Sequence, residues 1–346
     1  MPWAARGRSA GVSALLLATF GLASAGSEDH ERLNLVTYMN EVSDLFGFLQ
    51  VSAEEHSLNP VIIGYGQTAW WPDGLGVKIN ALRKFVFGDL GLNEIVLFVD
   101  AFDVLIFGDR EQIVRDFEAL EEKEQRSIFF NAEQYCFPPG FEKEYPETPH
   151  RWRYLNSGII IGRVSALREM LPDPVDDIIP GSDQAWYHRY YAAHHDKVGL
   201  DTNCAVICTA NGANGPEDGV ELHGRRLFNV DTGTYPSVLH LPGPGHWPAF
   251  KNGVLSTRIV EIFGELYPAE YRKLFDVYEF SLRLGGVLNN KHGLRSDQKR
   301  AYQKLMRFIN CWKCRFLGSS DSLCASFYSL TSGGSFSGAW PWLAQP

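Results

Sequence analysis

Two aspartates at the end of an apolar strand are the most informative feature of the chain. Residues 95–99 are apolar throughout, Asp100 follows at once, and Asp103 closes the next turn. Carboxylates that converge on one point repel each other unless a cation neutralises them. Mg²⁺ and Mn²⁺ accept such oxygens while keeping positions free for a substrate diphosphate. The alternative is that Asp-x-x-Asp only caps a turn, and the motif alone does not decide between the two.

His240 ends a second short apolar segment and precedes a loop rich in glycine and proline. From that position one imidazole nitrogen could turn toward the same cation. Two acids and one histidine form a mixed oxygen and nitrogen set that suits Mn²⁺. Because a single histidine is more often structural, His240 taken alone is only a candidate ligand.

Alternating strands and helices must position these residues. The apolar patterns predict strands at 33–38, 60–64, 95–99, 104–107, 127–131 and 154–161. Helical spacing of apolar residues predicts helices at 42–56, 77–87, 109–124 and 164–170. This order predicts an α/β sheet whose functional residues lie at the carboxyl ends of strands.

The composition excludes two broad classes of protein. The chain has 346 residues, with 32 Lys plus Arg against 41 Asp plus Glu, so its formal charge is −9. It therefore lacks the basic surface of a general nucleic-acid binder. A hydrophobic share of 45% with 21% charged residues predicts a folded chain and not a disordered one. This length allows one large domain with an appendage, or two domains.

The first 25 residues have the pattern of a secretory signal peptide. Arg6 and Arg8 precede an apolar stretch at 12–23, and residues 23–25 (Ala-Ser-Ala) give a small-x-small cleavage pattern. The stretch is too short to span a bilayer; the alternatives are an uncleaved anchor or a chance apolar start. No later run of 18 apolar residues occurs. We therefore expect no transmembrane span after cleavage, and a location in the endoplasmic reticulum or Golgi lumen or outside the cell.

The oxidising environment of the secretory pathway would allow the cysteines to form disulfides. The chain has six of them, at Cys136, Cys204, Cys208, Cys311, Cys314 and Cys324. An even number favours disulfides, but the sequence does not predict the pairing. Cys311 and Cys314 have the spacing of a zinc or redox pair, yet no second pair follows. A structural disulfide or free thiols are therefore favoured over zinc.

The character of the sequence changes near residue 251. Amphipathic patterns predict helices at 259–271, 278–284 and 298–308, which together make a helical extension over 251–317. Residues 318–346 are rich in serine and glycine and have no periodicity. We expect this tail to be poorly ordered.

Several short motifs in a fixed order resemble a known family, the glycosyltransferase domain of the multifunctional procollagen lysyl hydroxylases. The motifs are Gly64-Tyr-Gly with Trp70, Gly76-Val-Lys78, Phe98-Val-Asp100-Ala-Phe-Asp103, Asn131-Ala-Glu133, Cys136-Phe-Pro138, Tyr154-Leu-Asn156-Ser-Gly158, Ser182-Asp183-Gln184, Leu200-Asp201, and His240 with Gly243-Pro244. The resemblance runs from about residue 35 to residue 245. It implies a Rossmann-like GT-A domain over residues 32–250, with a central mixed, mostly parallel sheet followed by the helical extension. It also implies a UDP-sugar as donor and Mn²⁺ as cofactor.

The resemblance implies roles for the charged residues at the donor. Asp100, Asp103 and His240 are similar to the metal ligands of the family, and Lys78 matches a basic residue in its glycine-rich loop. A cation and a lysine would together offset the negative charge that develops on the UDP leaving group. For Lys78 the alternative is a solvated charge on the surface of a helix.

The resemblance also implies contacts with the nucleotide sugar. Thr37 falls where family members contact the nucleotide, and Phe102 falls where an aromatic ring stacks near the uracil. Gly243 lies in the loop after the histidine motif. Trp70 and Trp71 could line a sugar or acceptor cleft, since aromatic faces pack against sugars, or they could equally belong to the core.

Three polar residues are candidates for the catalytic step. Asp183 matches an acidic position near the donor sugar, where it could accept a proton or stabilise positive charge; it could also cap the helix that follows. Glu133 is either an acceptor-side carboxylate or a salt-bridge partner. Asn156 could hold a sugar hydroxyl or merely cap a turn.

The chain also departs from the family pattern. Leu241, Pro242 and His246 stand where the family usually has glycine, asparagine and lysine, and the family's acids before Asp183 are reduced to residues 180–182 (Pro-Gly-Ser). These changes weaken the expected grip on the diphosphate and bear on the choice of acceptor. After residue 251 only one histidine occurs and no His-x-Asp iron motif, so we do not expect hydroxylase activity.

The sequence therefore predicts a glycosyltransferase that uses Mn²⁺ and UDP-glucose, with UDP-galactose as the second candidate. Its acceptor would be a hydroxyl of a protein or glycoprotein, such as hydroxylysine or galactosyl-hydroxylysine in a collagen-like partner. One alternative is a catalytically silent domain that binds a sugar or nucleotide. A thiol oxidoreductase built on Cys311 and Cys314 is disfavoured because their flanks lack a thioredoxin-like pattern.

Overall fold

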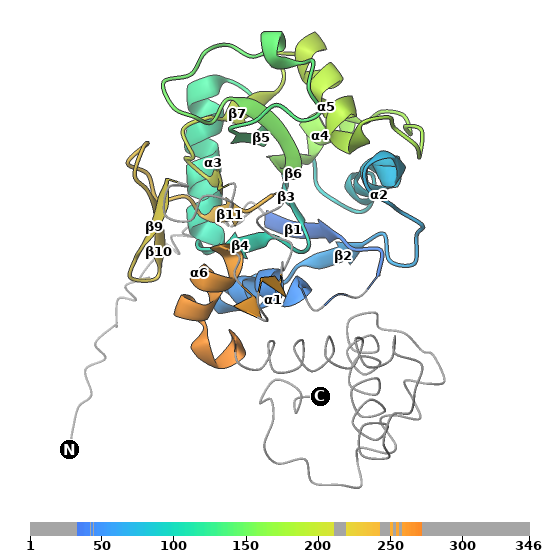
Figure 1. Ribbon diagram of the computed structural model, residues 1–346. Helices are drawn as coiled ribbons and strands as arrows, with labels where there is room; N and C mark the ends of the chain where they lie inside the picture. The colour runs from blue at the N-terminus through green and yellow to red at the C-terminus, as the bar shows by residue number, and fades with distance from the viewer. Residues whose placement is uncertain are drawn as a thin grey trace, which may run out of the picture.

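A six-stranded sheet lies at the centre of the computed structural model (Figure 1). The structure describes residues 33–41, 43, 45–210, 219–242, 250–251, 254–255 and 258–271. The strand order of the sheet is β2-β1-β3-β6-β5-β7. The strands are β1 (Leu33–Tyr38), β2 (Val61–Ile63), β3 (Ile95–Asp100), β5 (Ile128–Glu133), β6 (Tyr154–Arg163) and β7 (Gly199–Asp201).

This sheet is mixed and mostly parallel. Strand β1 is parallel to β2 and β3, β5 is parallel to β7, and β6 is antiparallel to both β3 and β5. The expected GT-A type of α/β fold is therefore confirmed. Because β1 and β3 are parallel, their carboxyl ends meet at one edge, where Tyr38 lies beside Asp100.

Helices cover both faces of the sheet (Figure 1). They are α1 (Phe46–Glu55), α2 (Gly76–Val86), α3 (Arg110–Glu124), α4 (Val164–Met170), α5 (Ser182–Ala193) and α6 (Arg258–Leu266), with short 3₁₀ turns at Asp73–Leu75 and Glu142–Glu144. Helix α3 begins where the Asp109 carboxylate accepts a hydrogen bond from the backbone N–H of Gln112 at 2.9 Å.

Alternate residues of the central strands face two different hydrophobic cores. On β3, Leu97 packs into the core that contains α1 and α3, whereas Phe98 packs into the core that contains α2, α4 and α5. A strand buried on both faces needs apolar residues at successive positions. This explains why β3 appears in the sequence as an unbroken apolar run.

A smaller sheet brings distant parts of the chain to the end of β3. Its order is β4-β11-β8, with β4 (Val104–Ile106) antiparallel and β8 (Ile207–Thr209) parallel to β11 (Val238–His240). Two further ribbons pair β9 (Val220–His223) with β10 (Arg226–Asn229), and β12 (Phe250–Lys251) with β13 (Val254–Leu255).

The described helices and strands confirm most of the secondary structure predicted from the sequence. Helix α4 has the bounds expected for it, while α1 is shorter at both ends than 42–56. The predicted signal segment, the helices at 278–284 and 298–308, and the tail at 318–346 lie outside the described residues, so they stay predictions. In the part that the structure describes, no helix is both long enough and apolar enough to cross a membrane. The three cysteines described there are free thiols: Cys136, Cys204 and Cys208.

Candidate functional site

Three side chains from two sheets converge at the end of β3. Asp100 is the last residue of β3, Asp103 stands just before β4, and His240 ends β11. The pairing of β4 with β11 brings the two segments together, since the backbone N–H of Leu241 donates to the carbonyl of Asp103 at 2.9 Å. One ligand atom from each of the three side chains lies within 4.8 Å of the others. The 137-residue separation between Asp103 and His240 is thus closed by strand pairing.

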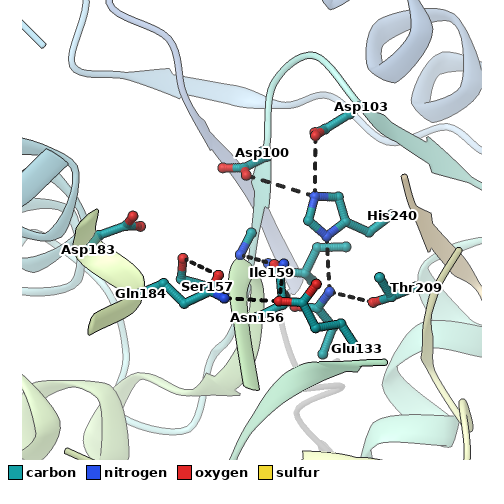
Figure 2. A network of polar contacts seen from close by, with 12 residues as sticks. Asp100, Asp103, Glu133, Asn156, Ser157, Ile159, Asp183, Gln184, Thr209 and His240 are labelled. Carbon is teal, nitrogen blue, oxygen red and sulfur yellow. Dashed lines mark hydrogen bonds and ion pairs between the residues drawn. The ribbon is translucent and has the colours of Figure 1, made fainter. Parts of the chain in front are cut away.

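The geometry fits a small divalent cation. His240 Nε2 is 3.4 Å from Asp103 Oδ2 and 3.8 Å from Asp100 Oδ2 (Figure 2). Two carboxylates and one imidazole are a donor set that Mn²⁺ accepts. Gly158 of β6 forms the floor of the site, because a Cβ atom there would lie 2.2 Å from His240 Cε1 and 2.8 Å from Asp100 Oδ2. The absence of a side chain at this position leaves room for an ion.

Lys78 joins this cluster to a third acid. Its ammonium group lies 2.7 Å from Asp100 Oδ1 and 3.1 Å from Asp183 Oδ2. Only 7% of Lys78 is exposed, so the alternative of a solvated helix charge is wrong. Burial alone would lower the lysine pKa, but the two carboxylates outweigh it and raise that pKa. Asp100 therefore faces Lys78 with one oxygen and His240 with the other.

Asp183 lies in the first turn of α5 and is almost fully buried. The helix begins after Gly181, which has the left-handed backbone conformation that glycine favours. Asp183 is therefore not the N-cap, which corrects the capping alternative. Its carboxylate instead faces Lys78 across the site.

Glu133 belongs to a buried amide network with Asn156 of β6 and Gln184 of α5. Its Oε1 accepts hydrogen bonds from Asn156 Nδ2 at 3.0 Å and Gln184 Nε2 at 2.9 Å (Figure 2). Burial raises the pKa of Glu133 to about 7, although the two amide hydrogen bonds act in the other direction. A carboxyl group that titrates near neutral pH can exchange a proton with a substrate hydroxyl.

Asn156 uses both ends of its amide. Besides its bond to Glu133, its Oδ1 accepts from the backbone N–H of Gly158 at 2.7 Å. The turn-capping alternative is therefore correct in part, because Asn156 bonds to the backbone two residues further on. The amide also fixes Glu133, so Asn156 links the metal-facing glycine to a titratable carboxyl.

The second ring nitrogen of His240 contacts Asn131, which in turn contacts Thr209; the sequence assigned no role to either residue. Asn131 Nδ2 lies 3.0 Å from His240 Nδ1 and donates to Thr209 Oγ1 at 2.7 Å. Both residues are fully buried. Asn131 was visible in the sequence only as part of a motif, and Thr209 gave no signal, because its pairing with His240 depends on the register of β8 and β11.

The structure describes Thr37 and Phe102, two of the residues expected to contact the nucleotide. Thr37 is fully buried beside Val99 of β3, and its hydroxyl oxygen has no hydrogen-bond partner among the described residues. Phe102 packs against the core that contains α1 and α3. Gly243 lies outside the described residues.

The two tryptophans are exposed, so the core alternative is wrong for both. Trp70 is 49% and Trp71 is 70% exposed. Trp71 stacks on Phe137, with 5.9 Å between ring centroids, which joins the loop before α2 to the loop after β5. The stacked rings therefore hold these two exposed loops against each other.

Comparison with known proteins agrees with the motifs. A family model described as the PLOD GT domain matches residues 29–249. Procollagen-lysine,2-oxoglutarate 5-dioxygenase of Drosophila melanogaster is 30% identical over 245 residues, covering 66% of this chain and 33% of that protein. Multifunctional procollagen lysine hydroxylase and glycosyltransferase of Caenorhabditis elegans is 28% identical over 232 residues, covering 62% of this chain and 31% of that protein. The chain thus spans about a third of the length of these relatives.

Among solved structures, a glycosyltransferase involved in the glycosylation of the major capsid of PBCV-1 aligns with a TM-score of 0.36 at 11% identity. The alignment covers 61% of this chain and 93% of that one. This TM-score is too low to carry an argument, so the assignment to a family depends on the match over residues 29–249.

Proposed function

The chain belongs to the family of PLOD GT domains, and we propose that it is a Mn²⁺-dependent glycosyltransferase acting on protein-linked hydroxyl groups. The donor is UDP-glucose, with UDP-galactose as the second candidate. The acceptor is hydroxylysine or galactosyl-hydroxylysine in a collagen-like protein of the secretory pathway. The names of the relatives, which refer to procollagen lysine, support this choice of acceptor.

The convergence of Asp100, Asp103 and His240 within 4.8 Å is the observation that carries the proposal. These residues would hold the ion through the two carboxylates and the Nε2 atom of the imidazole. When bound, Mn²⁺ would supply positive charge to the diphosphate oxygens and so favour the departure of UDP. On the donor side, the unpartnered hydroxyl of buried Thr37 supports a nucleotide contact; Phe102, Trp70 and Gly243 stay proposed donor contacts.

Lys78 would provide the second positive charge. In the reaction the bond from the sugar C1 to the diphosphate oxygen breaks, and a new bond joins C1 to the acceptor oxygen. The electron pair of the broken bond leaves with UDP, and the acceptor hydroxyl loses its proton. A buried ammonium 2.7 Å from Asp100 is placed to pair with the phosphate oxygens as their charge grows.

Two carboxyl groups would serve the reacting sugar. Asp183, held by Lys78 at 3.1 Å, would stabilise the positive charge that develops near C1. Glu133, with its pKa raised to about 7 by burial, would accept the proton of the acceptor hydroxyl. Asn156 would keep Glu133 in place through its 3.0 Å hydrogen bond.

A UDP-release assay over several donor sugars tests the proposal, with galactosyl-hydroxylysine and hydroxylysine peptides as acceptors. We expect UDP release to require Mn²⁺, to stop on addition of EDTA, and to fall at least about 100-fold in Asp103→Ala, since a whole metal ligand is lost. Asp89→Ala is the matched control, because Asp89 is an exposed aspartate outside the site. Turnover that survives EDTA, or survives in Asp103→Ala, would refute the metal assignment.

Calorimetry together with the UDP-release assay distinguishes an enzyme from a catalytically silent domain. The residues at 241, 242 and 246 that depart from the family pattern are the reason to consider this second function. Calorimetry with UDP and Mn²⁺ would then show binding, while no donor sugar would give UDP release with any acceptor. Release of UDP above the level in Asp103→Ala would exclude the silent domain.

A further inference from the structure

Asn131 is a buried residue directly behind the candidate metal ligand His240. It lies in β5 at an irregularity where the register with β6 shifts between Phe130 and Asn131. The shift sets Asn131 opposite Asn156, and the Asn131 side chain reaches the imidazole of His240 and the hydroxyl of Thr209. No solvent reaches Asn131, which is 0% exposed. Its hydrogen bonds must therefore be made within the protein.

With no ion bound, a backbone contact sets the orientation of the Asn131 amide. The N–H of Ile159 donates to Asn131 Oδ1 at 3.2 Å. A backbone N–H can only donate, so the atom that faces it must be the amide oxygen. The amide nitrogen consequently points the other way and uses its two hydrogens on Thr209 Oγ1 and His240 Nδ1, at 2.7 and 3.0 Å.

This orientation decides where His240 carries its proton. Because Asn131 donates to Nδ1, that nitrogen must be an acceptor, and the proton of the neutral ring lies on Nε2. Nε2 is the nitrogen that faces Asp103 and Asp100. A cation needs the lone pair of that same nitrogen. Metal-binding histidines ordinarily donate their other N–H to an acceptor, and the amide group presents a donor there instead.

We infer that Asn131 is a positioning residue with two amide orientations, and that cation binding selects the second. In the second orientation Oδ1 accepts from His240 Nδ1–H. The Thr209 hydroxyl, which can donate or accept, reverses its role. The neutral imidazole changes tautomer: it loses the proton on Nε2 and gains one on Nδ1, so the number of protons on the ring is unchanged. The N–H of Ile159 loses its acceptor and faces the amide nitrogen, whose two hydrogens lose Thr209 and His240 as acceptors. The site therefore binds its ion less tightly than it would with a carboxylate behind His240. This inference rests on the proposed cation site.

Asn131→Asp tests the inference, because the inference predicts that this variant binds Mn²⁺ more tightly. A carboxylate can accept from Ile159 N–H, Thr209 O–H and His240 Nδ1–H together, so the ion-bound tautomer loses no hydrogen bond. We expect Mn²⁺, titrated alone and followed by electron paramagnetic resonance, to bind about 10-fold tighter or more, the usual scale for such outer partners. A residue with only a structural role would give no gain in affinity.

The charge control is Asn156→Asp, which adds the same charge to the buried network at the position opposite Asn131. Equal tightening in the two variants would mean that added charge alone is responsible and would overturn the inference. So would unchanged or weaker binding in Asn131→Asp while the wild-type protein binds Mn²⁺. If the wild type binds no Mn²⁺, the cation site of the proposed function fails, and the inference fails with it.

A measurement on the wild-type protein needs no variant at Asn131. Nitrogen-15 NMR of histidine-labelled protein distinguishes protonated from unprotonated ring nitrogens, and His240→Gln identifies the signals of His240. Without metal we expect the proton on Nε2, and with diamagnetic Mg²⁺ we expect it on Nδ1. A proton on Nδ1 in the metal-free protein would overturn the inference even if Asn131→Asp does not fold.

Discussion

Lys78 holds two acids that have different expected roles. Asp100 faces the proposed cation, and Asp183 faces the proposed sugar position, yet both contact the same buried ammonium group. Lys78 and Asp183 are almost fully buried, while the side chain of Asp100 is 34% exposed. These charges depend on one another, because removing one partner leaves the buried ones in a medium that solvates them poorly. The residue that pairs with the substrate would thus also keep the empty site stable.

We predict that Lys78→Met lowers the free energy of unfolding by about 3 kcal/mol in the absence of metal, the scale for breaking a buried ion pair. The loss should be smaller at saturating Mn²⁺, because the ion then neutralises Asp100. Urea unfolding with and without Mn²⁺ measures both values. Lys84→Met, at an exposed position of the same helix, should change little. Equal losses in the two variants would count against the shared role of Lys78.

The raised pKa of Glu133 predicts that the stability of the protein falls as the pH rises. Burial raises its pKa from 4.5 to about 7, so the folded state holds the proton more tightly than the unfolded chain. The associated stability is fully present below about pH 4.5 and is lost as the pH rises through 7. The expected loss is on the order of 3 kcal/mol, since each pKa unit corresponds to about 1.4 kcal/mol.

Glu133→Gln should remove this dependence, because the amide imitates the protonated carboxyl and can still accept from Asn156 and Gln184. Urea unfolding between pH 4.5 and 8 should therefore show the variant gaining stability relative to wild type as the pH rises. Parallel curves would mean that the pKa of Glu133 is not raised. Glycosyl transfer should fall in the variant at every pH, because the amide accepts no proton.

The sequence analysis found the charged members of the site and Asn156, and it missed the other neutral members. Asp100 and His240 stand where apolar strands end, so the rule that sites lie at strand ends located them. Asn131, Thr209 and Gln184 lie inside strands or a helix, and their contacts arise only from strand register and helix packing. The position of Asp183 was also misjudged in one alternative, because Gly181 and not the acid begins α5.

At the scale of elements, β6 passes directly beneath the ligands contributed by β3 and β11. It contributes backbone without a side chain there, since Gly158 faces His240 and Asp100 closely. Strand β6 is antiparallel to β3, and this close approach is possible only with glycine. A change at Gly158 would therefore act on the proposed metal site through the spacing of the strands.

We predict that Gly158→Ala weakens Mn²⁺ binding at least about 10-fold while the protein still folds. The added methyl group would stand 2.2 Å from His240 Cε1 and 2.8 Å from Asp100 Oδ2, so the ligands must move apart, and metal sites tolerate displacements of only about 0.2 Å. Electron paramagnetic resonance of Mn²⁺ gives the affinity, and circular dichroism checks the fold. Gly91→Ala is the control, because a methyl group there meets Glu94 at an ordinary 3.5 Å. Unchanged affinity in Gly158→Ala would place the ion elsewhere.

The long elements were predictable, and the short ones were not. The apolar run of β3 and the helical spacing of α4 are strong signals because many successive residues agree with one period. Strands β7, β8 and β11 have three residues each, too few to establish an alternation. Of these, β11 drew notice through His240, whereas β8 was missed together with the hydroxyl that it brings behind the imidazole.

At the scale of the whole molecule, the proposed cation site joins residues of the two sheets. Asp100 belongs to the six-stranded sheet, while His240 belongs to the three-stranded sheet. The unfolded chain cannot hold these residues together, so an ion that binds them binds the folded state alone. Binding of that kind stabilises the fold by mass action, to an extent set by the ratio of free ion to its dissociation constant.

We predict that Mn²⁺ raises the midpoint temperature of unfolding by roughly 5 to 10 °C at a free concentration 100 times its dissociation constant. That ratio corresponds to about 2.7 kcal/mol, and a folded unit of this size shifts by about 2 to 4 °C for each kcal/mol. Differential scanning fluorimetry measures the shift, and EDTA should reverse it. Asp103→Ala should abolish the response and Asp89→Ala should keep it. A shift that persists in Asp103→Ala would mean that the ion stabilises the protein from another site.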